Sequence, residues 1–519
     1  MENYIINKLK NIPIHLKVTF VSAFVLALLV HGVGFFHNWL NEDSLFYLRN
    51  SMAYLYQLGR WFLVALQYIR GFYTVPWLIG ITATVFLAGA TTLMVSVLGV
   101  TNKIHCVLIA LLTVTFPAWA NQFMYDFLAD AYPAAMLLAV LAVYYTRKYR
   151  FGFIAGAFSL MFSLALYQSF LSFAIGLSIL LVIRYLLEGE RTLKEILRYG
   201  GKFLLCGVLG LIFYVISVQV SLWITGGELF SYQGMDALGQ ISLSELPQLI
   251  WDSYRGVFHG FYRTGPDFVE NALYVSHALF AFYALLFLIM VYLLARAILA
   301  NKLYRNLPAF LCLGLCLLLF PLGLNIIVIT APTAEAHILT TNAFLLGIFF
   351  VFVLLDIYKP ARQALAAVVL ALSLLIGGNY WVQSGTFYFV QHMQYEHTMA
   401  FYNRLVMRIE STPGYEPGMP ISIVGEVPFY DLGTNNVLSD RQRQIVGFDE
   451  RRPVIGLGDP YKFFLFTRNY LGLYFSHAAA ELEEAVIQTP EFAAMPLYPR
   501  DGSIAIIDGV LVVRLSETS

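Results

Sequence analysis

The sequence predicts an all-α polytopic membrane protein that carries a small α/β domain at its C-terminal end. Hydrophobic residues make up 59% of the 519 positions and charged residues only 12%, whereas about 25% charged residues is typical of soluble domains. Long apolar runs recur along most of the chain, and the composition becomes more polar from residue 383. We therefore divide the chain into a transmembrane module, 1–382, and a C-terminal domain, 383–519.

The apolar runs are long enough to cross a bilayer, which takes about 17–25 residues of α-helix. About eleven can be distinguished, although Pro and Gly interrupt several of them. We expect spans at 18–36, 74–98, 104–120, 131–146, 151–166, 169–187, 203–225, 272–295, 307–330, 338–355 and 364–382. Basic clusters flank the stretch 151–187 at both ends, so the chain has to cross twice there and turn near Tyr167 and Gln168.

Lysine and arginine are distributed unequally between the two sets of loops. One set, which includes the N-terminus, holds 17 of the 32 Lys and Arg residues, the other set holds 5, and the C-terminal region holds the remaining 10. Short loops rich in Lys and Arg stay in the cytoplasm. We therefore expect a cytoplasmic N-terminus and a C-terminal domain outside the cytoplasm. Acidic and basic residues balance at 32 each, so no overall basic charge points to a nucleic-acid partner.

The loops predicted to lie outside carry most of the side chains that could do chemistry. Carboxylates serve general base catalysis or metal binding, arginine binds phosphate through two hydrogen bonds, and Tyr or Trp stacks on sugar rings. Together they fit a lipid donor that bears a phosphate and a carbohydrate acceptor. The candidate catalytic residues are Glu42, Asp43, Asp126 and Asp130, and the candidate substrate-binding residues are Arg60, Trp61, Tyr167, Gln168, Arg255, Arg263, Glu335 and His337.

Simpler roles are open for several of these residues. Glu42 and Asp43 also fit solvated loop positions or helix N-caps, and Asp126 or Asp130 could cap the fourth span. Interfacial Trp and Tyr commonly anchor a protein in the membrane interface. Arg60 lies in an apolar stretch, where an unpaired charge is costly, so we expect a carboxylate or phosphate partner. The four cysteines fall inside apolar runs and are interpreted as packing residues.

Several short motifs occur in a suggestive order. An acidic pair in NEDSL follows the first span, LGRW comes later in the same loop, an acidic second outer loop follows, and LYQSFLS joins spans five and six. In this order the chain resembles the Gtr-type (type-two) serotype-conversion membrane glucosyltransferases, relatives of the GT-C superfamily. The resemblance covers most of 18–400 and implies a GT-C-like transmembrane module.

The resemblance also implies substrates and roles. The donor would be undecaprenyl phosphate-glucose, and the acceptor would be O-antigen or another envelope glycan, reached outside the bacterial cytoplasmic membrane. The catalytic base maps onto Asp43, with Glu42 as the alternative, and a second acidic position maps onto Asp126 or Asp130. No DxD-like motif stands in a cytoplasmic loop, which agrees with a lipid-linked donor. The transfer would be an inverting single displacement.

Other readings remain open at this point. Asp126 and Glu335 could bind the acceptor or a divalent metal ion, and the sequence identifies no certain cofactor. A polysaccharide polymerase or ligase would also use arginines in outer loops. A lipid-linked sugar flippase or transporter would place polar residues at mid-span and show internal repeats, and we find neither.

The C-terminal region reads as a small domain that begins with an amphipathic helix over 386–410, which leaves the membrane surface. ISIVGEVP predicts a short strand, AELEEAVIQTPEFAAM predicts helix, and SIAIIDGVLVVRLSE predicts a β-hairpin that turns at Asp508 and Gly509. This domain either shapes the acceptor site or only stabilises the protein.

Overall fold

The structure is a computed structural model, and it describes residues 10–37, 39, 41, 43–47, 53–230, 244–262, 276–331, 338–358, 363–425 and 460–517. Its contacts divide the chain into two compact units. The first unit contains Met1–His37, Ser51–Phe387 and Gln444–Gly447. The second unit contains Asn38–Asn50, Tyr388–Arg443 and Phe448–Ser519. The acidic NEDSL segment therefore belongs to the same unit as the C-terminal region, and the rest of its loop belongs to the first unit.

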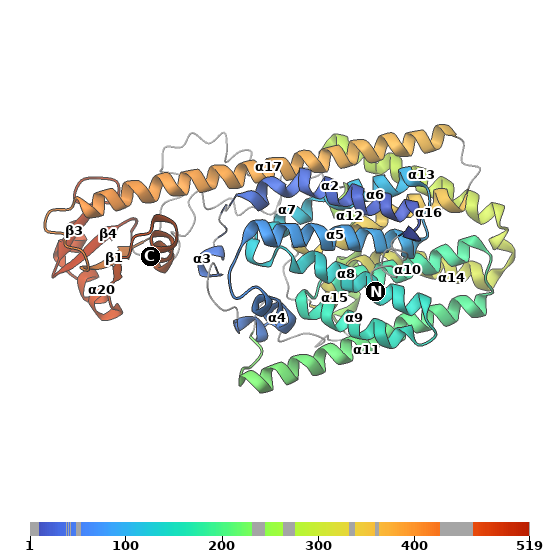
Figure 1. The fold of residues 1–519 in the computed structure, drawn as a ribbon, viewed down its shortest axis with the longest axis horizontal. Helices are drawn as coiled ribbons and strands as arrows, with labels where there is room; N and C mark the ends of the chain where they lie inside the picture. Colours follow the sequence, from blue (N-terminus) through green and yellow to red (C-terminus); the bar gives the residue numbers. More distant parts are fainter. Residues whose placement is uncertain are drawn as a thin grey trace. The chain divides into compact units, whose positions relative to one another are not determined.

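The first unit is a bundle of helices (Figure 1). Its first half comprises α2 (Ile14–Phe36), η1 (Ala53–Tyr56), α4 (Trp61–Ile69), α5 (Pro76–Leu98), α6 (Lys103–Thr115), α7 (Pro117–Phe123), η2 (Asp126–Leu128), α8 (Ala131–Lys148), α9 (Gly152–Leu166) and α10 (Phe170–Glu188). Its second half comprises α11 (Leu193–Thr225), α12 (Leu246–Tyr262), α13 (His277–Ala300), η3 (Leu303–Arg305), α14 (Leu307–Leu324), α15 (Ile327–Thr330), η4 (Ile338–Thr340), η5 (Asn342–Phe344), α16 (Leu345–Ile357) and the first part of α17 (Gln363–Glu410).

Among the described residues, eight helices are long and apolar enough to cross a membrane, or nine if α6 and α7 form one bent span. Two shorter apolar helices, Gly152–Leu166 and Asn342–Ile357, accompany them. The chain is therefore a multi-pass membrane protein, and every apolar run singled out in the sequence overlaps a helix of this set. The total of eleven crossings stays a prediction.

The bend between α6 and α7 follows from the sequence TFPAW. Pro117 has no backbone N–H to continue the α6 hydrogen bonds, and its ring disfavours helical backbone at Phe116. Phe116 accordingly has φ −56° and ψ 127°, and the two helices meet at 45°.

The helices of the first unit differ in how deeply they are buried. The apolar windows of α8 and α10 are each 78% buried, whereas those of α11, α13 and α14 are each 28% buried. A helix that is apolar on all sides but exposed on most of them can only be stable against lipid. We therefore interpret α8 and α10 as the centre of the bundle and α11, α13 and α14 as its lipid-facing edge.

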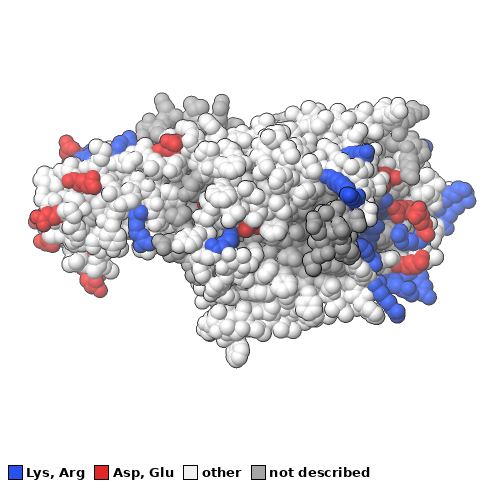
Figure 2. Space-filling view, in the orientation of Figure 1, with Lys and Arg blue, Asp and Glu red and all other residues white. Residues whose placement is uncertain are grey.

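Charged side chains gather at one end of the first unit, where α8, α10 and α13 finish (Figure 2). Arg184 on α10 forms ion pairs with Glu188 at 2.6 Å and with Asp356 of α16 at 3.0 Å, and it donates to the carbonyl of Leu98 at the end of α5. Arg147 donates to the carbonyl of Ser96 at 3.0 Å. Cations are stabilised at the ends of helices whose carbonyls lack partners. Four loops predicted to be cytoplasmic, those after α5, α8, α10 and α16, thus share one end, while their orientation in a membrane stays a prediction.

The second unit contains a four-stranded sheet in the order β2-β1-β4-β3. Its strands are β1 (Pro420–Val424), β2 (Ser476–His477), β3 (Ile504–Ile507) and β4 (Val510–Arg514), and its short helices are α3 (Ser44–Tyr47), α19 (Pro460–Phe466), η6 (Thr467–Leu471), α20 (Ala480–Ile487) and α21 (Pro490–Ala494). Strand β1 runs parallel to β2 and β4, and β3 pairs with β4 antiparallel. The predicted strand, hairpin and helices are therefore confirmed. Asp508 and Gly509 both have positive φ, at 47° and 79°, as the tight hairpin turn requires.

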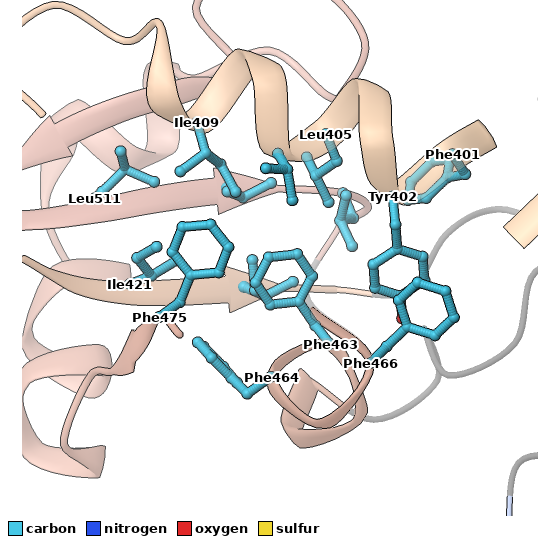
Figure 3. Close-up of a cluster of buried hydrophobic side chains, with 14 of the residues drawn as sticks. Phe401, Tyr402, Leu405, Ile409, Ile421, Phe463, Phe464, Phe466, Phe475 and Leu511 are labelled. Atoms are coloured by element: carbon cyan, nitrogen blue, oxygen red, sulfur yellow. The ribbon is translucent and has the colours of Figure 1, made fainter. Parts of the chain in front are cut away.

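The last turns of α17 pack on one face of this sheet. Phe401, Tyr402, Leu405 and Ile409 on α17 meet aromatic side chains from α19 and apolar side chains from β1 and β4 (Figure 3). The helix predicted over 386–410 is confirmed, and it is continuous with the preceding predicted span, because α17 runs without a break from Gln363 to Glu410. No proline lies between these positions, so nothing in the backbone interrupts the hydrogen bonds of the helix.

Candidate active site

The LGRW motif forms the start of α4. Gly59 adopts φ 68°, a left-handed conformation that closes the 3-10 turn η1. The backbone N–H of Arg60 donates to the carbonyl of Leu55 at 2.9 Å, and α4 then begins at Trp61. The glycine therefore permits the tight turn after which Arg60 and Trp61 begin a short helix.

Arg60 is held by the turn between α9 and α10. Its Nε donates to Oε1 of Gln168 at 3.4 Å, and its guanidinium carbon lies 5.0 Å from the centre of the Tyr167 ring. Nε2 of Gln168 donates to the carbonyl of Leu58 at 3.0 Å and to the Tyr214 hydroxyl at 2.9 Å. Because both contacts of this amide nitrogen are acceptors, the amide oxygen is turned toward Arg60. The sequence placed Arg60, Tyr167 and Gln168 on one side of the membrane, and the structure brings the three side chains together.

The charge of Arg60 is not neutralised within the part of the chain that the structure describes. No Asp or Glu oxygen of these residues lies within 4.0 Å of its guanidinium, and the two terminal nitrogens make no hydrogen bond to them. The side chain is only half-buried. A partly desolvated guanidinium with free planar donors is well suited to bind an anion such as a phosphate.

The first unit has an apolar groove of about 480 Å³, whose lining includes the residue that follows this arginine in the chain. Trp61, the next residue in the chain, lines the groove and donates from its indole Nε1 to Oγ of Ser217 at 2.9 Å. Phe213, the neighbour of Tyr214, lines it as well. The groove lies between η1, α4, α9 and α11, and its lining consists of Tyr56, Trp61, Ala65, Phe158, Met161, Phe213, Ile216, Ser217, Val220, Ser221, Ile224 and Thr225.

Asp130 has a cationic partner that the sequence did not single out for it. Its Oδ1 lies 3.3 Å from Nη1 of Arg70, and the hydroxyl of Thr82 donates to its Oδ2 at 3.5 Å. Only 8% of the Asp130 side chain and 13% of the Arg70 side chain are exposed. Asp130 occupies the N-cap position of α8, but its side chain makes no capping hydrogen bond. This carboxylate therefore serves as the counter-ion of Arg70.

The start of α8 also contacts the group formed by Arg60, Tyr167 and Gln168. The ring of Tyr132, two residues after Asp130, meets the Tyr167 ring edge-on at 5.0 Å. Asp126 is buried nearby in the chain, in η2, and its Oδ1 accepts from the backbone N–H of Phe127 at 2.8 Å. Three predicted outer segments, around 58–70, 126–132 and 167–168, therefore lie at the same end of the first unit.

Asp43 lies in the second unit. Its backbone N–H donates to Oδ1 of Asn41 at 2.8 Å, and its own carbonyl accepts from the N–H of Phe46. Leu45 and Phe46 anchor the segment. Leu45 is fully buried in the aromatic core, and the Phe46 ring stacks on the Tyr461 ring with 6.2 Å between their centres. The Asp43 side chain itself is exposed.

Further contacts fix the chain on both sides of this short helix. Nδ2 of Asn469 donates to the carbonyl of Leu45 at 3.3 Å, and Nε2 of Gln391 donates to the carbonyl of Trp39 at 3.4 Å. From the sequence, the C-terminal region could either shape the acceptor site or only stabilise the protein. These contacts show that it also holds the segment that carries Asp43.

Of the remaining candidates, only Arg255 is among the described residues. Arg255 lies on an exposed face of α12. Glu42, Arg263, Glu335 and His337 fall outside the described residues. Among the residues that are described, no group of three or more His, Cys, Asp or Glu side chains could hold a metal ion. Whether Asp43 and Arg60 act on one substrate stays a prediction.

Two residues of the site were not predicted from the sequence. Tyr214 and Ser217 lie within the apolar run of α11, where they looked like ordinary polar interruptions of a span. The spacing of three residues, which puts both on one helical face, was the available signal.

Fold and site together define a multi-pass membrane protein with a cationic site beside an apolar groove. The family model described as glucosyl transferase GtrII matches residues 32–355, which is more than half of the chain. The chain therefore belongs to this family, and the family resemblance predicted from the motifs is confirmed. Membership makes the protein a membrane glucosyltransferase, which favours the transferase over the polymerase, ligase and flippase readings. Neither the curated proteins nor the solved structures gave a match.

Proposed function

We propose that this protein transfers glucose from a polyprenyl phosphate donor, such as undecaprenyl phosphate-glucose, to a glycan of the bacterial cell envelope. The reaction takes place at the outer face of the cytoplasmic membrane, with the N-terminus in the cytoplasm and the second unit outside. The acceptor is O-antigen or a similar polysaccharide, and the chain adds a single glucosyl branch to it.

The donor would bind at Arg60 and the adjoining groove. A polyprenyl phosphate combines one anionic group with a long apolar chain, and the first unit offers a cation without an acidic partner among its described residues next to a mostly apolar groove. The terminal nitrogens of Arg60 would bind two phosphate oxygens, while the first isoprene units occupy the space between α4, α9 and α11.

The chemistry is a single displacement at the anomeric carbon. An acceptor hydroxyl oxygen forms the new bond to this carbon as the bond from the carbon to the phosphate oxygen breaks. The hydroxyl proton passes to a carboxylate, for which Asp43 is the first candidate and Glu42 the second. The electron pair of the broken bond stays on the polyprenyl phosphate, whose added negative charge Arg60 stabilises. The anomeric configuration is inverted.

The acidic residues take different parts in this scheme. Asp130 keeps Arg70 neutralised inside the protein and does not act as the base, because a base has to reach the acceptor hydroxyl. Asp126 and Glu335 are assigned to the acceptor side, where carboxylates bind sugar hydroxyls. No step of the scheme needs a metal ion.

The observation that supports this proposal best is the half-buried guanidinium of Arg60 beside the groove. Mass spectrometry of the envelope polysaccharide, with and without this protein, tests the function. We expect one hexose branch per repeat to disappear when the protein is removed and to return when it is restored. A shorter polysaccharide with unchanged repeats would instead indicate a polymerase and would refute the proposal.

A further inference from the structure

Helix α12 crosses the ends of three membrane spans. The hydroxyl of Ser253 donates to the carbonyl of Asn325 at 3.0 Å, directly after the end of α14. Further along α12, the Phe261 ring lies 5.2 Å from Tyr283, in the second turn of α13, and 6.0 Å from Phe344, just before α16. Because α14 ends where α13 and α16 begin, the helix lies across one face of the bundle.

One side of α12 is fitted closely to these spans. Leu249, Ser253, Val257 and Gly260 are buried and fall on one helical face. A Cβ atom at Gly260 would lie 3.0 Å from the Phe344 ring, so glycine permits the close approach.

The opposite side of α12 carries a stripe of large exposed side chains. Trp251, Arg255, Phe258 and Tyr262 follow one another at spacings of four, three and four residues, so they form a single line on the helix. The three aromatic residues are 64%, 47% and 49% exposed, respectively. Aromatic side chains in a line with one arginine are typical of helices that lie in a membrane interface.

The stripe continues a lipid-facing surface. The Tyr254 hydroxyl donates to the carbonyl of Leu318 on α14, so the two helices touch at this point. Leu311, Leu315 and Leu318 form an exposed line on α14, one of the least buried helices of the bundle. The exposed aromatic residues of α12 therefore lie beside the exposed leucine line of α14. We infer that both surfaces face lipid on the same side of the bundle.

We propose that α12 is an interfacial helix, whose stripe of Trp251, Arg255, Phe258 and Tyr262 inserts into the outer leaflet of the bilayer. The aromatic rings lie at the boundary between headgroups and acyl chains, and Arg255 faces the lipid phosphates. The occupant is bulk phospholipid, and the proposal does not depend on the donor, the acceptor or the catalytic base.

Site-directed spin labelling in vesicles of phosphatidylethanolamine and phosphatidylglycerol tests the proposal. The label is placed at Phe258→Cys in an active full-length chain whose four cysteines are replaced. A label at Leu315→Cys, on the lipid-facing line of α14, gives the deep reference, and one at the exposed Asp501→Cys gives the water reference. We expect the label at 258 to be more accessible to oxygen than to a water-soluble nickel complex, about 5–10 Å below the lipid phosphates.

Two results would overturn the proposal. Accessibility to nickel equal to that at 501 would mean that the stripe faces water, where a glycan could bind. Protection from both reagents would mean that protein covers it. If the cysteine-free chain is inactive, quenching of tryptophan fluorescence by brominated lipids is measured in the otherwise native protein instead. We expect the Trp251→Phe variant to show less quenching than the native chain. Equal quenching in the two proteins would also reject an interfacial α12.

Discussion

Replacement of Arg60 by glutamine gives the sharpest test of the donor site. Glutamine keeps a polar amide on a shorter side chain but removes the positive charge and the planar pair of terminal NH2 groups. Those nitrogens have no partner among the described residues, so up to two charge-assisted hydrogen bonds to the donor phosphate would be lost. Each is worth about 1.5–3 kcal/mol, and the half-exposed setting favours the lower value. A total of about 3 kcal/mol corresponds to a roughly hundredfold loss in kcat/KM.

The assay is glucosyl transfer by the purified chain in lipid nanodiscs, with polyprenyl phosphate-glucose as the varied substrate. If Arg60 binds the phosphate equally in the ground and transition states, the loss falls on KM. If it stabilises the charge that develops on the leaving phosphate, the loss falls on kcat. Arg60→Lys restores the charge without the planar pair of donors, so we expect it to recover about half of the lost free energy, roughly tenfold in kcat/KM.

The matched control is Arg296→Gln. Arg296 is exposed at the charged end of the first unit, where its guanidinium donates to the Tyr358 hydroxyl at 2.9 Å. We expect this variant to retain kcat/KM within about twofold, as is usual for a surface substitution. If Arg60→Gln folded normally and retained activity as well as the control does, the assignment of the donor phosphate to Arg60 would be refuted.

Three further predictions concern the carboxylates and the second unit. Asp43→Asn lowers kcat by about two decades with an unchanged donor KM, as measured by the same assay, and near-normal turnover would exclude Asp43 as the base. Asp130→Asn leaves the Arg70 charge buried and costs about 3–5 kcal/mol of stability, seen as a lower thermal midpoint. The double change of Arg70→Met with Asp130→Leu regains most of this loss, and no recovery would contradict the buried-pair account. Leu45→Ala removes a fully buried side chain and lowers the free energy of unfolding by about 2–5 kcal/mol. We therefore expect faster limited proteolysis of the second unit. An unchanged rate would mean that Leu45 does not anchor the loop.

The membrane helices could be predicted because each depends on local hydropathy. Every apolar run identified in the sequence overlaps a helix, and the bend after α6 also has a local cause in Pro117. The hairpin at Asp508 and Gly509 was equally readable, since its turn residues lie next to each other. Where a few neighbouring residues fix the backbone, their identity is sufficient.

The division of the first outer loop could not be predicted. The structure assigns Asn38–Asn50 to the second unit and the chain from Ser51 to the first, although the loop reads as continuous. The contacts responsible join residues far apart in the sequence, such as Asn469 and Leu45, which are 424 positions apart. Pairings of this kind depend on which surfaces match after the chain has folded, and hydropathy or periodicity contains no information about them.

The placement of Asp43 changes how the C-terminal region should be regarded. A catalytic base has to be held within a fraction of an ångström of its working position, which a free loop does not achieve. Here Leu45 and Phe46 fix the segment to a core built from α17, α19 and the sheet. If Asp43 is the base, the second unit is therefore part of the catalytic apparatus rather than an appendage. Substitutions in its core would then lower turnover through the position of Asp43, while donor binding at Arg60 in the other unit would be preserved.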